Sequence, residues 1–329
     1  GTNHDSSGRA PSGNLLEVRD LSVEFATDQG SIRAVDGVGF DVRPGEVLGV
    51  VGESGCGKSV TALSLLKLLP VPPSRIVSGS ALFEGRDLLG LTPVQLRSVR
   101  GREISMIFQD PMASLSPLHT VGRQLVEAQT LHREIGPAAA RAEALRWLQQ
   151  VGIPDAEARL SSYPFELSGG MRQRVMIAMA LMLKPRLVIA DEPTTALDVT
   201  IQAQIFDLMR ELKGDRTAMM LITHDMGVIW ETCDRVLVMY AGRIVEEGPV
   251  RDLFAAPRHP YTAGLLRSMP RLKPEGRRLV SIPGQVPSPG DYPAGCRFAA
   301  RCPHAWERCR AEAPPLFEAG ACRRAACFL

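Results

Sequence analysis

The sequence is poor in aromatic residues and has no long hydrophobic run. Phe, Trp and Tyr make up 5% of the 329 residues, whereas apolar residues as a group make up 45%. That apolar share is enough for a substantial core. No stretch reaches the ~18 consecutive apolar residues that a membrane-spanning helix needs. The polar residues 1–14 lack the apolar segment of a signal peptide, and we expect them to form a disordered N-terminus.

A strong excess of charge is also absent, because the formal net charge is only +2. The charges are unevenly distributed, however. From Arg251 onward there are 13 Lys and Arg against 6 Asp and Glu. Such a basic segment could face phosphates, anionic lipid or an acidic protein. A solvated surface is the simpler interpretation of the same residues.

The C-x2-C pair that is common in zinc ribbons and ferredoxins is missing from the C-terminal part of the chain. Seven cysteines are nevertheless present, and five of them lie between Cys296 and Cys327 with the spacing C-x5-C-x6-C-x12-C-x4-C. In a reducing compartment, a cluster of this kind indicates a metal site rather than disulfides. The spacing alone does not choose between an iron–sulfur cluster and zinc.

Hydrophobic patterning predicts an α/β fold. Residues 15–25 and 34–43 alternate apolar and polar side chains as strands do, and residues 58–69 have the periodicity of a helix. Farther along, short apolar runs alternate with helical segments, which favours a largely parallel sheet. Further strands are predicted at 46–51, 103–108, 187–190, 219–223, 236–240 and 243–246. We expect the helical segments over about 110–182 to form an inserted subdomain, and residues 251–329 to form a C-terminal extension.

A glycine-rich loop lies between the predicted strand 46–51 and the predicted helix. Its sequence fits the pattern G-x-x-x-x-G-K-[ST], in which backbone N–H groups and the helix N-terminus bind phosphate. We expect Lys58 to reach the β- and γ-phosphates of a nucleotide and Ser59 to ligate Mg²⁺. The predicted ATP-binding residues of this segment are Gly52, Glu53, Ser54, Gly55, Cys56, Gly57, Lys58, Ser59 and Val60.

Three of the predicted strands lead into polar side chains that suit phosphoryl transfer to water. Asp191 follows an apolar strand and can hold Mg²⁺, while the adjacent Glu192 can act as general base for the attacking water. Gln109 and His224 follow two other strands. We expect Gln109 to sense the metal and the water, and His224 to contact the γ-phosphate.

Leu167-Ser168-Gly169-Gly170 is the most discriminating motif, because it can place a hydroxyl, backbone N–H groups and a helix N-terminus against phosphate. With the preceding features, it resembles the ATPases of ABC transporters over about residues 15–250. The resemblance implies a P-loop (RecA-like) core, an antiparallel β subdomain, an inserted α-helical subdomain and a head-to-tail dimer. Each ATP would lie between the phosphate loop of one subunit and Ser168, Gly169 and Gly170 of the other.

Two further roles are implied only by this resemblance. Ala196-Leu197-Asp198 is similar to the loop that crosses the dimer interface, which makes Asp198 a contact in trans. Phe25 is similar in position to the aromatic residue that stacks on adenine, and an ordinary strand phenylalanine is the alternative interpretation. Met171 stands where the family often has Gln. That departure leaves the phosphate contacts of Ser168 and the two glycines in place.

Within the family, the chain resembles the ATPase subunits of oligopeptide, dipeptide and nickel importers. This closer resemblance implies a second, often non-identical ATPase subunit, two transmembrane permeases and an extracytoplasmic substrate-binding protein. It implies a peripheral location at the cytoplasmic face of the cell membrane. The segments that carry it are Asp110-Pro111-Met112-Ala113-Ser114-Leu115-Ser116-Pro117, Pro193-Thr194-Thr195-Ala196-Leu197-Asp198-Val199-Thr200, His259-Pro260-Tyr261-Thr262, Gly295-Cys296-Arg297-Phe298 and Arg301-Cys302-Pro303.

The same resemblance implies a small Cys-rich C-terminal module that holds a [4Fe–4S] cluster. Its ligands would be Cys296, Cys302, Cys309 and Cys327, with Cys322 as an alternative ligand. Zn²⁺ is the alternative metal, with His304 as a candidate ligand.

The leading hypothesis is an ATP-hydrolysing subunit of a peptide-type importer. The alternative, from a different class, is a soluble ABC ATPase that acts on nucleic acid and has a zinc-binding tail. The sequence has no long coiled-coil insertion and no aromatic-rich basic patch, so we expect no nucleic-acid partner. A third hypothesis, an iron–sulfur sensor that binds ATP, requires ATPase activity that depends on redox state.

Overall fold

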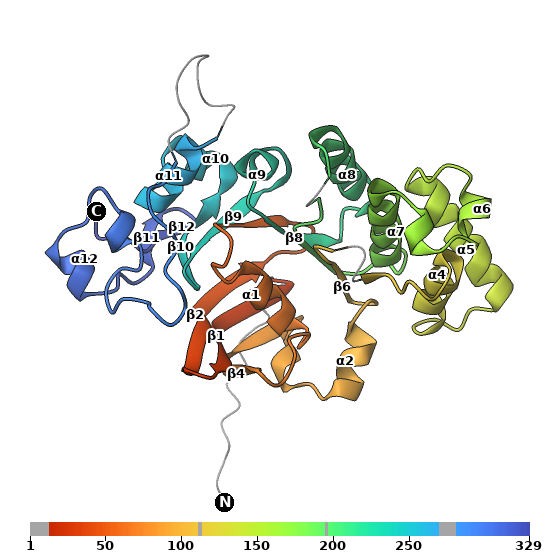
Figure 1. Cartoon of the computed structure of the whole chain (residues 1–329), viewed down its shortest axis with the longest axis horizontal. Coiled ribbons are helices and arrows are strands. Elements are labelled where there is room, and N and C mark those ends of the chain that lie inside the picture. Colours follow the sequence, from red (N-terminus) through yellow and green to blue (C-terminus); the bar gives the residue numbers. More distant parts are fainter. Residues whose placement is uncertain (1–12, 111–113, 195–196, 270–280) are drawn as a thin grey trace, which may run out of the picture.

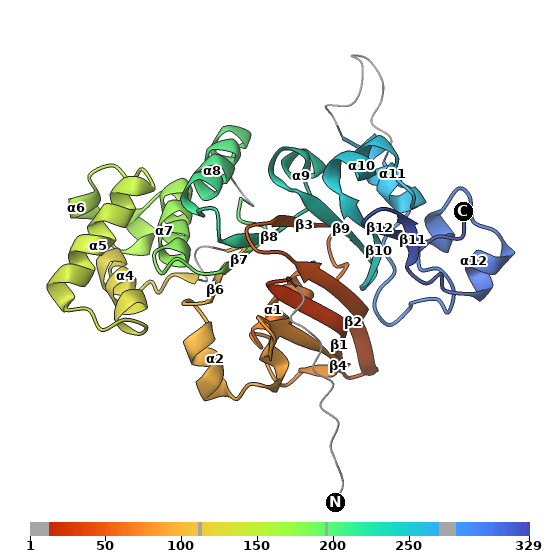
Figure 2. The same ribbon diagram turned by 180° about the vertical axis from the view of Figure 1, so that it is seen from behind.

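The computed structural model describes residues 13–110, 114–194, 197–269 and 281–329. Helices α4 to α6 lie at one end of the molecule and the C-terminal elements at the other, with a small antiparallel sheet to one side of the centre (Figure 1). The reverse view in Figure 2 shows the same separation. Among the described residues, no helix has both the length and the apolar character needed to cross a membrane.

The small sheet is built from the N-terminal strands β1 (Leu16–Thr27), β2 (Gly30–Val42), β4 (Ser74–Phe83) and β5 (Arg86–Asp87). Its strand order is β2-β1-β4-β5, and every pairing is antiparallel. Leu16, Leu21 and Phe83 are fully buried and belong to the core cluster that also includes residues of the large sheet. This apolar contact joins the small sheet to the nucleotide-binding part of the molecule.

The large sheet has the order β11-β12-β10-β9-β3-β8-β7-β6. Strands β9, β3, β8, β7 and β6 run parallel, whereas β10, β12 and β11 continue the sheet in antiparallel pairs. The central parallel strands are almost wholly buried, as expected where helices cover both faces. The strands of the large sheet are β3 (Val47–Val51), β6 (Ile104–Ile107), β7 (Leu187–Asp191), β8 (Ala218–Thr223), β9 (Arg235–Tyr240), β10 (Arg243–Pro249), β11 (Phe317–Gly320) and β12 (Arg323–Ala325).

Helices cover the sheet and form the lobe at one end. The lobe packs through a second apolar cluster, in which Leu125, Leu148 and Ile177 are fully buried. The α-helices are α1 (Lys58–Leu65), α2 (Pro93–Val99), α4 (Val121–Thr130), α5 (Pro137–Gln150), α6 (Ala156–Arg159), α7 (Gly169–Leu181), α8 (Val199–Leu212), α9 (Met226–Thr232), α10 (Val250–Ala255), α11 (Pro260–Arg267) and α12 (Glu307–Ala311). The short 3-10 helices are η1 (Leu88–Gly90), η2 (Pro164–Glu166) and η4 (Ala299–Arg301).

The predicted α/β class and the predicted strands before each motif are confirmed. The helix expected over 58–69 is shorter, because it ends at Leu65 and Lys67 takes a left-handed φ of 48°. Strands β4, β5, β11 and β12 were not predicted from the sequence. Residues 1–12 of the expected disordered terminus lie outside the described residues, as do residues 111–113 at the start of the helical segment.

Candidate functional site

The phosphate loop joins β3 to α1 and is tightly enclosed by backbone. Gly52 has φ 155°, and a Cβ atom there would lie 2.2 Å from the carbonyl oxygen of Met239. Gly57 has φ 100°, and a Cβ atom there would lie 2.9 Å from the carbonyl oxygen of Ala34. Only glycine fits such positions without strain. The two close approaches therefore require the glycines that the phosphate-loop pattern has at these positions.

Lys58 and Ser59 are the first two residues of α1 and directly follow the glycines of this loop. The Nζ atom of Lys58 donates to the carbonyl oxygens of Gly52 at 2.7 Å and Glu53 at 3.1 Å. The Oγ atom of Ser59 donates to Oδ1 of Asp191 at 2.9 Å. The two oxygens expected to ligate Mg²⁺ are thus adjacent, although 132 positions separate the residues.

Burial raises the pKa of the Asp191 carboxyl above its ordinary value. The hydrogen bond from Ser59 opposes this rise, and the neighbouring Glu192 charge reinforces it. Asp191 is 5% exposed at the end of β7. A carboxylate that is poorly solvated and close to another carboxylate favours a bound cation, which supplies the missing positive charge.

The three side chains predicted to be catalytic, Gln109, Glu192 and His224, meet at the Glu192 carboxylate. Nε2 of Gln109 donates to its Oε2 at 3.2 Å, and Nδ1 of His224 lies 3.6 Å from its Oε1. Gln109, Glu192 and His224 follow β6, β7 and β8, which are neighbours in the parallel sheet, so their side chains meet at one edge. Glu192 has φ 44°, a left-handed conformation that costs a non-glycine residue of order 1 kcal/mol and is frequent at functional sites.

Ser168, Gly169 and Gly170 form the start of α7. The Oγ atom of Ser168 accepts the N–H of Met171 at 3.3 Å, so it caps the helix. The Cα positions of Gly169 and Gly170 lie beside Leu197 and Ile201. Asp198 caps the next helix, α8, by accepting the N–H of Ile201 at 2.9 Å. The N-termini of α7 and α8 are therefore side by side. Ala196 of the predicted interface loop lies outside the described residues.

Three other predicted contacts are placed as follows. Phe25 is partly buried on β1, where it pairs with Ile32 of β2. Val60 is partly buried on α1. Cys56 is fully buried, and its backbone N–H donates to the carbonyl oxygen of Glu53 at 3.3 Å. Burial also raises the pKa of the Cys56 thiol.

The four predicted cluster ligands surround one small cavity in the C-terminal extension. Cys296, Cys302, Cys309 and Cys327 all line a cavity of about 20 Å³, together with apolar side chains such as Phe298 and Phe328. Burial raises the pKa of three of these thiols, those of Cys296, Cys302 and Cys327. Nearby backbone N–H groups partly oppose the rise: that of Phe298 for Cys296, that of His304 for Cys302, and those of Phe328 and Leu329 for Cys327.

Cys322, the alternative ligand, is exposed and is not among the residues that line this cavity. His304 does line it. In the part of the chain that the structure describes, no three His, Cys, Asp or Glu side chains are grouped so that they could hold a metal ion.

Comparison with known proteins gives the family. Residues 35–195 match the family described as ABC transporter, and residues 245–309 match that described as oligopeptide/dipeptide transporter, C-terminal region. The chain is 57% identical to a probable peptide ABC transporter ATP-binding protein of Sinorhizobium fredii, over 95% of this chain and 94% of that protein. The chain belongs to the ATP-binding subunits of the oligopeptide and dipeptide ABC transporter family.

Other relatives agree with this assignment. The oligopeptide transport ATP-binding protein OppD of Salmonella typhimurium is 53% identical over 97% of this chain and 94% of its own length. A bacterial ABC transporter cassette solved as a dimer superposes with a TM-score of 0.64 at 25% identity, covering 72% of this chain and 99% of the cassette. A post-hydrolysis dimer of the same cassette, bound to ADP and Pi, gives the same values. The chain is therefore an ABC ATPase.

Two residues of the C-terminal extension hold the phosphate loop. Both stand in segments that carry the importer resemblance, but sequence reasoning did not predict this role. Tyr261 accepts the backbone N–H of Glu53 at 2.9 Å, and Arg301 pairs with the Glu53 carboxylate. Tyr261 and Arg301 lie 208 and 248 positions from Glu53, and no local pattern marks either contact.

Proposed function

We propose that this ABC ATPase powers the import of peptides and that Glu192 is its general base. The observation that carries the catalytic part is the arrangement around the Glu192 carboxylate, which lies between Gln109 and His224 and next to Asp191. A water molecule activated there would attack the γ-phosphate held by Lys58. General-base assistance of this kind is typically worth ~10²–10⁴-fold in rate.

The roles of the other residues follow from their positions. Ser59 and Asp191 would ligate Mg²⁺, which neutralises charge on the phosphates. Gln109 would orient the metal-bound or attacking water, and His224 would contact the γ-phosphate. Phe25 would stack on adenine, and the loop from Gly52 to Val60 would surround the phosphates.

A second subunit would complete each ATP site. The hydroxyl of Ser168 and the N-termini of α7 and α8 would form the surface that binds the phosphates of the partner's nucleotide. Asp198 would contribute from the same surface. The superposition on a cassette solved as a dimer supports this arrangement.

The proposed partners are a second ATPase subunit, two transmembrane permeases and an extracytoplasmic binding protein. The relatives named above are described as peptide or oligopeptide transport proteins, and this supports peptides as the cargo. The chain would act peripherally at the cytoplasmic face of the membrane. No relative named above is described as acting on nucleic acid, so that alternative finds no support.

Reconstituted transport tests this proposal. The chain would be assembled with candidate permeases and a second ATPase subunit in proteoliposomes, and uptake of a labelled peptide would be measured with the binding protein present. We expect peptide uptake that requires ATP and is lost in Glu192→Gln. ATP hydrolysis without uptake of any peptide, across di- to hexapeptides, would contradict the assignment of the cargo.

We further propose that the four cavity cysteines bind a [4Fe–4S] cluster, although in the part of the chain that the structure describes their side chains are not grouped closely enough to hold a metal ion. Four cysteines that line one largely apolar cavity would supply the four thiolates of such a cluster. The cluster would supply a rigid link between Cys296, Cys302, Cys309 and Cys327.

Anaerobic purification tests this second proposal. Visible absorbance, with about four irons and four sulfides per chain, is expected. The matched variants are Cys302→Ala, which should lose the cluster, and Cys322→Ala, which should retain it. Stoichiometric zinc without sulfide would show that the cysteines bind zinc, the alternative metal, and would contradict the [4Fe–4S] proposal.

A further inference from the structure

Glu53 places a carboxylate inside the phosphate loop, and two side chains of the C-terminal extension hold this residue. Oε2 and Oε1 of Glu53 accept from Nη1 and Nη2 of Arg301 at 2.7 and 2.9 Å. The backbone N–H of Glu53 donates to the hydroxyl of Tyr261 at 2.9 Å. Both the backbone and the side chain of this loop residue are therefore fixed from outside the loop.

The negative charge of Glu53 is unfavourable for the binding of ATP to this loop. ATP brings several negative charges, and its phosphates will be surrounded by residues on either side of Glu53. The carbonyl oxygen of Glu53 itself accepts from the Lys58 ammonium at 3.1 Å. An unpaired carboxylate on a residue of this loop would repel the triphosphate. The bidentate ion pair with Arg301 removes most of that repulsion.

Arg301 is buried and is oriented by contacts outside the phosphate loop. Its side chain is 5% exposed, whereas that of Glu53 is 32% exposed. Nε of Arg301 donates to the carbonyl oxygen of Pro283 at 2.8 Å, and its guanidinium lies 5.7 Å from the ring of Tyr240 and 5.9 Å from that of Phe298. Such a fixed guanidinium loses little freedom when it pairs with Glu53.

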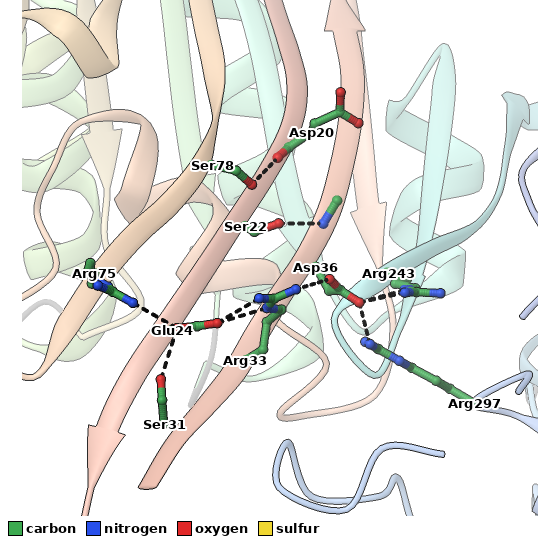
Figure 3. A network of polar contacts seen from close by, with 11 residues as sticks. Asp20, Ser22, Glu24, Ser31, Arg33, Asp36, Arg75, Ser78, Arg243 and Arg297 are labelled. Carbon is green, nitrogen blue, oxygen red and sulfur yellow. Dashed lines mark hydrogen bonds and ion pairs between the residues drawn. The ribbon is translucent and has the colours of Figure 1, made fainter. Parts of the chain in front are cut away.

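The same segment of the extension also holds the small sheet. Arg297, four residues before Arg301, donates to the Asp36 carboxylate of β2 and to the carbonyl oxygen of Ala241. Figure 3 shows Asp36 between Arg297, Arg243 and Arg33. The segment 297–301 thus contacts the phosphate loop through one arginine and β2 through the other.

We propose that Arg301 is a positioning residue for ATP binding, which acts by neutralising and orienting Glu53 in the phosphate loop. The residue lies outside the ATPase core and does not touch the reacting atoms. The inference requires ATP binding at this loop, but it depends neither on peptide cargo nor on a metal in the extension.

The test is the equilibrium Kd of MgATP for the full chain, measured by competition with a fluorescent ATP analogue. Arg301→Gln should raise the Kd roughly tenfold, because it leaves an uncompensated carboxylate near the phosphates. Arg301→Lys, which keeps the charge without the bidentate geometry, should have a smaller effect. Arg310→Gln, an exposed arginine of the same extension, should leave the Kd unchanged.

The decisive variant is Glu53→Gln combined with Arg301→Gln. The second substitution removes the repelling charge, so the Kd should return to within about threefold of wild type. The tenfold loss of the single variant should also shrink at high ionic strength, because salt screens like-charge repulsion. If Arg301 served only to fold the extension, Glu53→Gln would restore nothing and salt would have no such effect. That result, or a wild-type Kd in Arg301→Gln, would overturn the proposal.

Discussion

His224 and Gln109 hold opposite oxygens of one carboxylate: Nδ1 of His224 lies 3.6 Å from Oε1 of Glu192, and Nε2 of Gln109 donates to Oε2 at 3.2 Å. The Glu192 side chain is only 16% exposed, whereas that of His224 is 68% exposed. Gln109 therefore orients the carboxylate through one oxygen, and His224 lies close to the other. This geometry favours a base with a fixed direction over a mobile surface glutamate.

Glu192→Gln should abolish turnover and preserve binding. The amide keeps the shape of the side chain but cannot accept a proton from water, so we expect hydrolysis to fall by ~10²–10⁴-fold. The Kd for MgATP should remain within about twofold, because no phosphate contact is removed. Phosphate release and nucleotide binding measure the two effects. Glu157→Gln on the exposed α6 is the control, and full turnover in Glu192→Gln would reject the assignment.

Asp191→Asn should stabilise the nucleotide-free protein and remove its response to magnesium. Burial raises the native pKa of Asp191, so the native state gains a proton before the unfolded state as the pH falls. The free energy of unfolding thus decreases as the pH rises through that pKa, and the ionised carboxylate is a cost at neutral pH. Asparagine removes this cost.

Thermal unfolding at neutral pH, with and without MgATP, measures the effect of Asp191→Asn. The variant should melt higher than wild type without ligand, and MgATP should raise its Tm less than that of wild type. In wild type, the affinity for Mg²⁺ should weaken as the pH falls through the raised pKa. A lower Tm for the free variant would contradict the burial argument.

Gly295→Ala should disrupt the cysteine-lined cavity. A Cβ atom at this position would lie 2.4 Å from the carbonyl oxygen of Arg310 and 2.5 Å from that of Cys309. Backbone atoms cannot move aside cheaply, so we expect a loss of about 1–3 kcal/mol and faster alkylation of Cys296 and Cys309. Gly290→Ala, whose Cβ would lie 3.7 Å from Ile32, is the matched control. Equal effects of the two substitutions would show that the close approach is unimportant.

The thiols should react with a maleimide in an order set by exposure. Cys322 is exposed and should be modified first, whereas Cys56 is fully buried and should be modified last in the native protein. Burial also raises the pKa of the thiols of Cys56 and Cys233, which lowers their thiolate fractions further. Peptide mapping by mass spectrometry gives the order, and early labelling of Cys56 would show that the phosphate loop opens.

The parts of the molecule that sequence reasoning predicted depend on local patterns. The phosphate loop has a fixed spacing between strand and helix, and Gln109, Asp191 and His224 each follow a short apolar strand. These strands are neighbours in a parallel sheet, so the prediction that their ends meet required only the fold class.

The parts that were missed depend on contacts between distant segments. Strand β4 lacks a regular alternation of buried and exposed residues along Ser74–Phe83. Strand β12 is only three residues long and is held in the sheet by its pairing with β10, in which Ala325 lies opposite Glu246. The pair of Glu53 with Arg301 is likewise a product of tertiary structure, since charge and spacing alone offer many possible partners.

Strand β12 also protects an edge. It covers β10, which would otherwise end the large sheet with unpaired N–H and C=O groups on the side away from β9. A protein cut back to the ATPase core would present that bare edge to other molecules and would tend to aggregate by strand addition. The C-terminal extension is therefore a poor target for truncation, and crystallisation or assay of this subunit should begin from the whole chain.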